Sequence, residues 1–309
     1  MRIALFCATN RGLRFLHKLA ELVPGAHFDV FSFREEATEP PFLDAIRTAT
    51  LGYGGRFHEA SRMSGARWRE FWDQTPVDLL LAVSWRYMIP RFVFERARLG
   101  AYTFHDSLLP AYRGFSPTVW SIINGEDHTG VTLFHMAEEV DSGDIVAQER
   151  VPIGPDETIA EVLERVTQVY LDILEAQLPA ILNGTAPRMA QDHRLATYTC
   201  KRTLEDNEID WHAPTDRIYN LIRAVTAPYP GATTTLEGRQ IHIWQAQRLP
   251  DYKRYIGRVP GRVVEICPGR GSVVLTGDGA LLITSVSVEG GERQRGDEVL
   301  NRLSHTLGR

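Results

Sequence analysis

The pattern of apolar and polar positions predicts alternating strands and helices at the start of the chain. Residues 3–8 form a short apolar run that is typical of a buried strand. Residues 13–22 carry apolar side chains at helical spacing, and residues 28–33 predict a second strand. A strand–helix–strand opening favours a doubly wound α/β layer. The intervening turn lacks G-x-G-x-x-G, so it predicts no dinucleotide site.

Further elements follow up to residue 182. Residues 36–58 contain two adjacent prolines and three glycines, which predict irregular structure. Residues 77–83 are almost continuously apolar, as in a strand buried on both faces. Helices are predicted at 67–72, 92–97, 118–124 and 158–182, and strands at 101–104, 129–135 and 145–151. The last helix begins with the capping-box pattern of Thr158 and Glu161.

The character of the chain changes near residue 195. A helix is predicted at 215–227, followed by five short runs at 232–236, 240–247, 261–266, 272–275 and 281–288. Turn signals such as Gly277-Asp278-Gly279 separate several of these runs, which is typical of a small β-barrel. We therefore expect two domains, residues 1–195 and residues 196–309.

Composition narrows the class of protein. With 43% apolar and 24% charged residues, the chain resembles a globular protein rather than a disordered or membrane one. A net charge of −5 argues against nucleic acid as the main partner. The three cysteines lie far apart without a C-x-x-C pattern, so they indicate neither a disulfide framework nor a zinc site. No apolar run suits a signal peptide or a membrane span, and we expect a cytoplasmic protein.

The candidate chemistry lies between residues 103 and 148. His105 follows the strand predicted at 101–104, and Asp141 follows the strand predicted at 129–135. Side chains at the ends of two strands of one sheet can meet across a cleft. There an imidazole can exchange a proton while a carboxylate fixes its tautomer. A satisfied structural histidine and aspartate remain the alternative from chemistry alone.

The same stretch resembles the folate-dependent formyltransferase family. The family signature matches His105, the S-L-L-P of 107–110, Arg113-Gly114, the W-x-x-x-N-G-E of 120–126, the G-V-T of 130–132 and the D-x-G of 141–143. The sequence pattern of residues 202–232, which includes I-D-W, I-R-A and P-Y-P-G-A, most resembles the family members that act on nucleotide-linked amino sugars. The resemblance implies a doubly wound, Rossmann-like N-terminal domain and a smaller, OB-like β-barrel C-terminal domain.

The resemblance also implies roles for particular residues. His105 would accept the proton of the attacking amine, and Asp141 would orient it. Thr103 stands where the family has a catalytic asparagine that stabilises the oxyanion. The donor, N10-formyltetrahydrofolate, would be held by the apolar loop after the strand at 77–83, which contains Ser84, Trp85, Arg86, Tyr87, Met88 and Ile89. Three further residues would also contact it: Arg113, Gly114 and Val140. From its residue type, Arg113 would contact a phosphate or the folate tail, or pair with an acid.

Several alternatives stay open at this point. The acceptor implied by the resemblance is a small amine, in particular a nucleotide-linked amino sugar. Water as the acceptor would make the protein a formyltetrahydrofolate hydrolase, and the missing asparagine would suit a non-catalytic binding module. Asp106 and Asp144 are expected to be turn or capping residues. His128 and His135 match no established metal spacing, so no metal is expected, and a homo-oligomer remains open.

Overall fold

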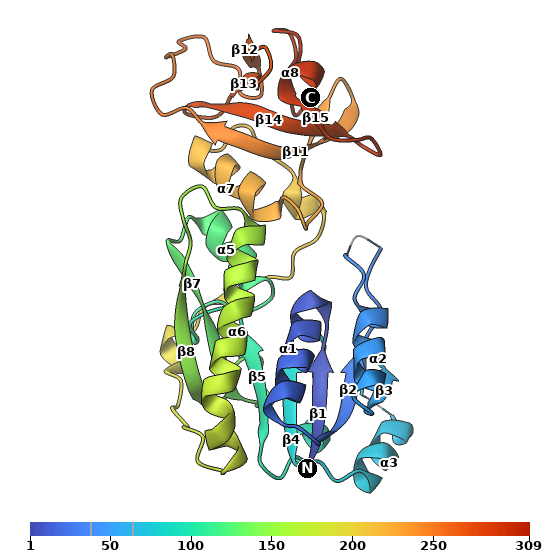
Figure 1. Ribbon diagram of the computed structural model, residues 1–309. Coiled ribbons are helices and arrows are strands. Elements are labelled where there is room, and N and C mark those ends of the chain that lie inside the picture. The colour runs from blue at the N-terminus through green and yellow to red at the C-terminus, as the bar shows by residue number, and fades with distance from the viewer. Residues whose placement is uncertain (38, 64) are drawn as a thin grey trace. The chain divides into compact units, whose positions relative to one another are not determined.

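A computed structural model describes residues 1–37, 39–63 and 65–309 (Figure 1). The chain forms two compact units. The first contains Met1–Pro117, Thr129–Val151 and Glu164–Cys200, and the second contains Thr118–His128, Pro152–Leu163 and Lys201–Arg309. A single division of the chain near residue 195 stays a prediction. No helix among the described residues is both long enough and apolar enough to cross a membrane.

A seven-stranded sheet organises the first unit. Its strand order is β3-β2-β1-β4-β5-β7-β8. The strands are β1 (Arg2–Cys7), β2 (His27–Ser32), β3 (Arg56–Glu59), β4 (Leu79–Val83), β5 (Ala101–His105), β7 (His128–His135) and β8 (Ile145–Pro152). The first five pair in parallel, and β7 runs antiparallel to β5. The predicted α/β domain with a parallel sheet is confirmed.

Helices cover both faces of this sheet. Ala4 and Phe6 of β1 face the core cluster that contains Trp72 of α3 (Ala66–Gln74) and Val93 of α4 (Arg91–Phe94). On the opposite face, α1 (Thr9–Leu22) packs on β1 and β4, and α2 (Leu43–Gly52) packs on β2 and β3 (Figure 1). The long helix α6 (Ile159–Leu182) contributes Tyr170, whose ring stacks on Phe104 of β5.

The prediction that residues 36–58 are irregular is wrong. Residue 38 lies outside the described residues, and the rest of this stretch contains α2 and most of β3 (Arg56–Glu59). The prolines precede the helix, Gly52 is its last residue and Gly54 and Gly55 follow it, so these residues mark its two ends rather than the absence of an element. Leu43, Ile46 and Thr50 supply the buried face of α2 at helical spacing. This buried face is short, and the prolines and glycines beside it are typical of loops, so the sequence pattern did not indicate a helix.

The second unit contains an antiparallel β domain, as predicted. Its strands β10 (Ala232–Leu236), β11 (Arg239–Arg248), β14 (Ala280–Val288), β13 (Gly271–Leu275) and β12 (Val263–Cys267) pair in that order, and β15 (Gln294–Arg295) pairs with β14. The helices of this unit include α7 (Thr215–Val225), α8 (Gly296–Val299) and, from Thr118 onward, α5 (Pro117–Asn124). The predicted elements of this part of the chain therefore lie within a few residues of the observed ones.

Candidate active site

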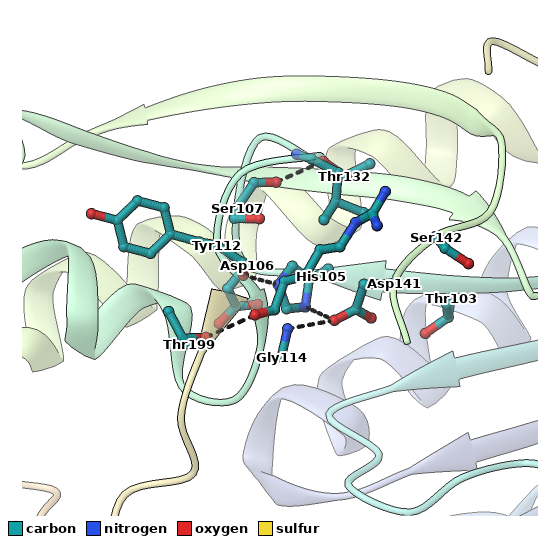
Figure 2. Close-up of polar contacts among 12 residues, drawn as sticks. Thr103, His105, Asp106, Ser107, Tyr112, Gly114, Thr132, Asp141, Ser142 and Thr199 are labelled. Atoms are coloured by element: carbon teal, nitrogen blue, oxygen red, sulfur yellow. Dashed lines mark hydrogen bonds and ion pairs between the residues drawn. The ribbon is translucent and has the colours of Figure 1, made fainter. Parts of the chain in front are cut away.

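Strand β5 places Thr103 and His105 on one face of the sheet. Residues alternate between the two faces of a strand. Phe104 therefore points to the side of α1, where its ring meets Phe15 edge-on at 5.3 Å between centroids. Ala101, two residues before Thr103, belongs to the core cluster on the other face. The strand thus directs Thr103 and the buried His105 toward the same region (Figure 2).

The turn that carries Asp141 brings its carboxylate to the same point. Asp141 adopts a positive φ of 51°. Its Oδ2 accepts a 2.8 Å hydrogen bond from the backbone N–H of Gly114 and lies 3.6 Å from Nδ1 of His105 (Figure 2). The His and Asp singled out in the sequence therefore lie within ion-pair distance. Both side chains are largely buried, which strengthens their electrostatic interaction.

The second ring nitrogen of His105 fixes the tautomer. Nε2 lies 2.7 Å from the backbone carbonyl oxygen of Tyr112. A carbonyl oxygen only accepts hydrogen bonds, so Nε2 of the neutral ring carries the hydrogen and Nδ1 carries the lone pair. A proton taken up by His105 therefore arrives at Nδ1, beside the Asp141 carboxylate. Tyr112 reaches this geometry through a positive φ of 58°.

Arg113 lies behind this pair and does not face a ligand. Its side chain is only 1% exposed, and its Nη2 donates a 2.6 Å hydrogen bond to Oε1 of Gln191. Gln191 in turn donates to the backbone oxygens of Asp141 and Gly143, at 2.9 and 2.7 Å. The guanidinium also contacts His193 and Tyr198. These neutral partners and this burial correct the prediction that Arg113 meets a phosphate, the folate tail or an acid.

Gln191 is a site residue that the sequence did not reveal. It lies 50 residues after Asp141 and belongs to no motif. Gly114, in contrast, has a clear reason to be glycine. Its φ is 104°, and a Cβ atom there would lie 2.6 Å from the backbone oxygen of Thr199. The Arg-Gly pair therefore supports the Asp141 turn from two sides.

The loop at 84–90 is mostly packed against the protein. Ile89 and Trp85 contact the core cluster, and the ring of Tyr87 lies edge-on to Phe33 at 5.0 Å between centroids. Ser84 adopts a positive φ of 53° where the loop leaves β4. Nε1 of Trp85 is a buried donor without a hydrogen-bond partner among the described residues. Rigid packing of this kind would hold the loop in one shape.

Other candidate folate-binding side chains point outward or pair with acids. Met88 is 59% exposed and Val140 is 46% exposed, so both offer apolar surface to a ligand. Arg86 forms ion pairs with Glu36, at 3.3 Å, and with Glu39. Its guanidinium also lies over the ring of Phe33. Arg86 therefore ties this loop to the segment after β2.

Thr103 uses its hydroxyl within the sheet. Its Oγ1 donates a 3.3 Å hydrogen bond to the backbone oxygen of Ala82, on the neighbouring strand β4. On the other side, Thr103 lies in register with Phe134 of β7. The bond to Ala82 is long, so rotation of the hydroxyl toward a charged oxygen would cost little. Among the described residues, no group of three or more His, Cys, Asp or Glu side chains could hold a metal ion.

Two family models match the chain. The formyl transferase model matches residues 32–177, and the model of the formyl transferase C-terminal domain matches residues 201–304. The chain belongs to the formyl transferase family of enzymes. The candidate site residues from Ser84 to Asp141 lie within the first match, whereas Gln191 lies outside both.

Several solved structures share this fold. HypX from Aquifex aeolicus in complex with tetrahydrofolic acid has 21% identity and a TM-score of 0.64, over 97% of this chain and 47% of that chain. An N-formyltransferase from Helicobacter canadensis, in complex with folinic acid and dTDP-3-aminofucose, has 14% identity and a TM-score of 0.68, over 94% and 99%. Methionyl-tRNA formyltransferase from Clostridium thermocellum has 18% identity and a TM-score of 0.59, over 82% and 95%. This chain spans about half the length of the HypX chain.

Proposed function

We propose that the protein transfers a formyl group from N10-formyltetrahydrofolate to the amine of a small acceptor, in particular a nucleotide-linked amino sugar. The observation that carries the proposal is the His105–Asp141 pair, in which Nδ1 can take up a proton beside a carboxylate. The ligands named for similar structures, tetrahydrofolic acid, folinic acid and dTDP-3-aminofucose, support this donor and this class of acceptor.

The transfer needs a proton acceptor close to the attacking amine. The amine nitrogen forms a bond to the formyl carbon while the carbonyl oxygen takes the negative charge. His105 accepts the proton that the nitrogen loses, and Asp141 stabilises the resulting imidazolium. The carbonyl then re-forms, the bond between the formyl carbon and N10 breaks, and the proton passes to N10. The products are a formamide and tetrahydrofolate.

Thr103 is the candidate to stabilise the oxyanion. It lies on the same face of β5 as His105, two residues away, and a hydroxyl can donate one hydrogen bond. Such a donor typically contributes about 10²–10³ in rate. To act in this way, the hydroxyl would have to exchange the Ala82 carbonyl for the substrate oxygen. Between turnovers, the Thr103 hydroxyl donates its hydrogen bond to the backbone oxygen of Ala82.

Replacing Thr103 with asparagine is expected to slow the reaction rather than restore a family-like site. The position lies between Ala82 and Phe134 on the neighbouring strands, so a larger side chain costs about 1–3 kcal/mol in overpacking. Steady-state kcat should therefore fall roughly 5- to 150-fold. Thr103→Ser, which keeps the hydroxyl, should stay close to the parent. A faster Thr103→Asn enzyme would contradict a pocket rebuilt around threonine.

Truncation of Met88 tests the folate loop. Met88→Ala should weaken tetrahydrofolate binding by about 1–2 kcal/mol, since an exposed apolar side chain gains burial only when the ligand covers it. Equilibrium titration by protein fluorescence measures the change. Leu51→Ala is a matched control, because Leu51 is 60% exposed on α2. Overlaying titrations of parent and Met88→Ala would show that this loop does not bind the donor.

The proposed activity is tested with N10-formyltetrahydrofolate and a panel of amines. We expect release of tetrahydrofolate that depends on an amine, together with a formylated product detected by mass spectrometry. Nucleotide-linked amino sugars should be the best acceptors. Release without any amine would indicate a hydrolase, and absence of turnover despite folate binding would indicate a binding module.

A further inference from the structure

The loop between His105 and Tyr112 is held on the neighbouring strand β7 by one buried threonine. Thr132 lies directly opposite His105 in the pairing of β5 with β7, so both side chains lie on the same face of the sheet. Its hydroxyl donates a 2.6 Å hydrogen bond to the backbone oxygen of Ser107 (Figure 2) and accepts a 3.1 Å bond from the backbone N–H of Leu109. Thr132 is fully buried, so these bonds form away from water.

A third hydrogen bond saturates the hydroxyl of Thr132. Nε2 of Gln148, on β8, lies 2.9 Å from Oγ1 of Thr132 and 2.8 Å from the backbone oxygen of Leu109, and it donates to both. A hydroxyl offers one donor and two acceptor lone pairs, so the full hydrogen-bonding capacity of this group is used. Such a hydroxyl has one orientation, and β7 and β8 together hold the loop in a fixed position.

Side-chain packing holds the same loop. Leu108 lies against Gly130 of β7, where a Cβ atom would lie 2.4 Å from Cδ2 of the leucine. Leu109 packs in a small buried cluster with Phe134 and Ile145. The S-L-L-P and G-V-T segments of the sequence therefore fit together. The glycine makes room for the first leucine, and the threonine bonds the backbone on either side of it.

The start of the loop is also held by β7. The backbone oxygen of Asp106 accepts a 2.7 Å hydrogen bond from Oγ1 of Thr129. The Asp106 carboxylate lies 2.7 Å from Nη1 of Arg11, on α1, and accepts a hydrogen bond from the hydroxyl of Tyr170, on α6. The expectation that Asp106 serves as a turn or capping residue is therefore wrong, because its side chain joins two helices.

The far end of the loop meets the ring of His105. Oγ of Ser107 donates a 2.6 Å hydrogen bond to the backbone oxygen of Ala111, and this bond closes the loop just before Tyr112. The backbone oxygen of Tyr112 then accepts a hydrogen bond from Nε2 of His105 at 2.7 Å. The position of this oxygen therefore depends on how firmly the loop is held.

We infer that Thr132 is a positioning residue, which acts through the loop of residues 107–112 to hold the carbonyl of Tyr112 at Nε2 of His105. This carbonyl keeps the hydrogen on Nε2 and leaves the lone pair of Nδ1 beside Asp141. Without a fixed carbonyl, the neutral ring can instead carry its hydrogen on Nδ1, and that tautomer cannot accept a proton there. The consequence for catalysis rests on the proposed function, whereas the consequence for the tautomer does not.

Thr132→Val tests this role, because valine keeps the shape of threonine but has no hydroxyl. We expect kcat to fall roughly 10- to 100-fold, since a displacement of the reacting groups by about 1 Å has an effect of that size. The affinity for tetrahydrofolate should stay close to that of the parent, because the hydroxyl is fully buried and a ligand does not reach it. Thr132→Ser, which keeps the hydroxyl, should retain most of the kcat of the parent.

Thr50→Val is the matched control for the loss of a buried hydroxyl. Thr50, on α2, is also fully buried, and its Oγ1 donates a 2.7 Å hydrogen bond to the backbone oxygen of Ile46. This change should lower the thermal stability without changing kcat. Equal losses of kcat in Thr132→Val and Thr50→Val, or an unchanged kcat in Thr132→Val, would overturn the positioning role.

Long-range proton–nitrogen correlation spectra of the histidine rings report the tautomer and need no substrate. They distinguish a ring nitrogen that carries the hydrogen from one that carries the lone pair, and the signals of His105 are identified by their loss in His105→Ala. We expect the hydrogen on Nε2 in the parent and in Thr50→Val, and a mixture of the two tautomers in Thr132→Val. Hydrogen on Nδ1 in the parent, or one and the same tautomer in the parent and Thr132→Val, would overturn the inference.

Ser107→Ala provides a second test if Thr132→Val fails to fold. It removes the bond to Ala111 that closes the loop and leaves the three hydrogen bonds of Thr132 in place. We expect a mixture of tautomers and a fall in kcat of about tenfold. Ring signals of His105 like those of the parent would contradict a loop that sets the tautomer.

The outcomes separate this inference from the proposed function. A mixture of tautomers in Thr132→Val, in a protein whose parent transfers no formyl group, would support the role of the loop and contradict the activity. Formyl transfer by the parent, together with one tautomer in every variant, would overturn the inference and leave the activity standing.

Discussion

Replacing His105 with alanine is expected to lower kcat for formyl transfer by about 10²–10⁴-fold while tetrahydrofolate affinity stays nearly constant. The imidazole acts when the amine loses its proton, so its loss affects the transition state more than the bound ground state. Single-turnover rates and an equilibrium titration on the same protein separate these two quantities.

His135→Ala is the matched control for this experiment. His135 is as buried as His105, at 8% exposure, and also places Nε2 near a backbone oxygen, that of Pro187. It faces no carboxylate of the proposed site, so its removal should change stability more than kcat. Full activity of a folded His105→Ala protein would exclude His105 as the proton acceptor.

Replacing Asp141 with asparagine should lower kcat by roughly 10²–10³-fold. Asparagine has nearly the same shape, and its Oδ1 can still accept the N–H of Gly114. The change therefore removes the charge beside Nδ1 of His105 while preserving the turn. Steady-state assays across pH should show the loss wherever the parent is active.

Asp144→Asn, three residues further on, is the control for the loss of a carboxylate. Asp144 pairs with Arg188, whose side chain is 64% exposed, and exposed pairs contribute little to stability. We expect kcat close to the parent. Equal losses in Asp141→Asn and Asp144→Asn would indicate that the whole turn matters rather than the charge next to His105.

The support of Asp141 depends on residues from distant parts of the chain. Gly114 donates directly to the carboxylate, and Gln191 holds the backbone of the turn. Arg113 then holds Gln191 from the interior. Arg113 supports Gln191 and Gly114 donates to Asp141, which explains why the Arg-Gly pair accompanies the His and Asp. Arg113 thus supports the Asp141 turn indirectly, through its hydrogen bond to Gln191.

The sequence by itself determined which residues are candidates and roughly where the elements lie. The continuous apolar run at 77–83 predicts a buried strand, and the helical spacing of apolar residues at 158–182 predicts a helix. The structure has a buried strand and a helix there, so local patterns were sufficient for these two elements. His105 follows one strand and Asp141 another, which is enough to predict their meeting at an edge of the sheet. The distance of 3.6 Å between them confirms that prediction of proximity.

Only the tertiary structure decided how these residues are used. The carbonyl of Tyr112 selects Nδ1 of His105, Gln191 turns Arg113 inward, and Arg11 reaches Asp106 across 95 residues of sequence. Each outcome depends on side-chain direction and strand register, which are set by packing between distant segments rather than by local preference. A motif names the residue types, but the face, the tautomer and the partner of each side chain are properties of the packed fold.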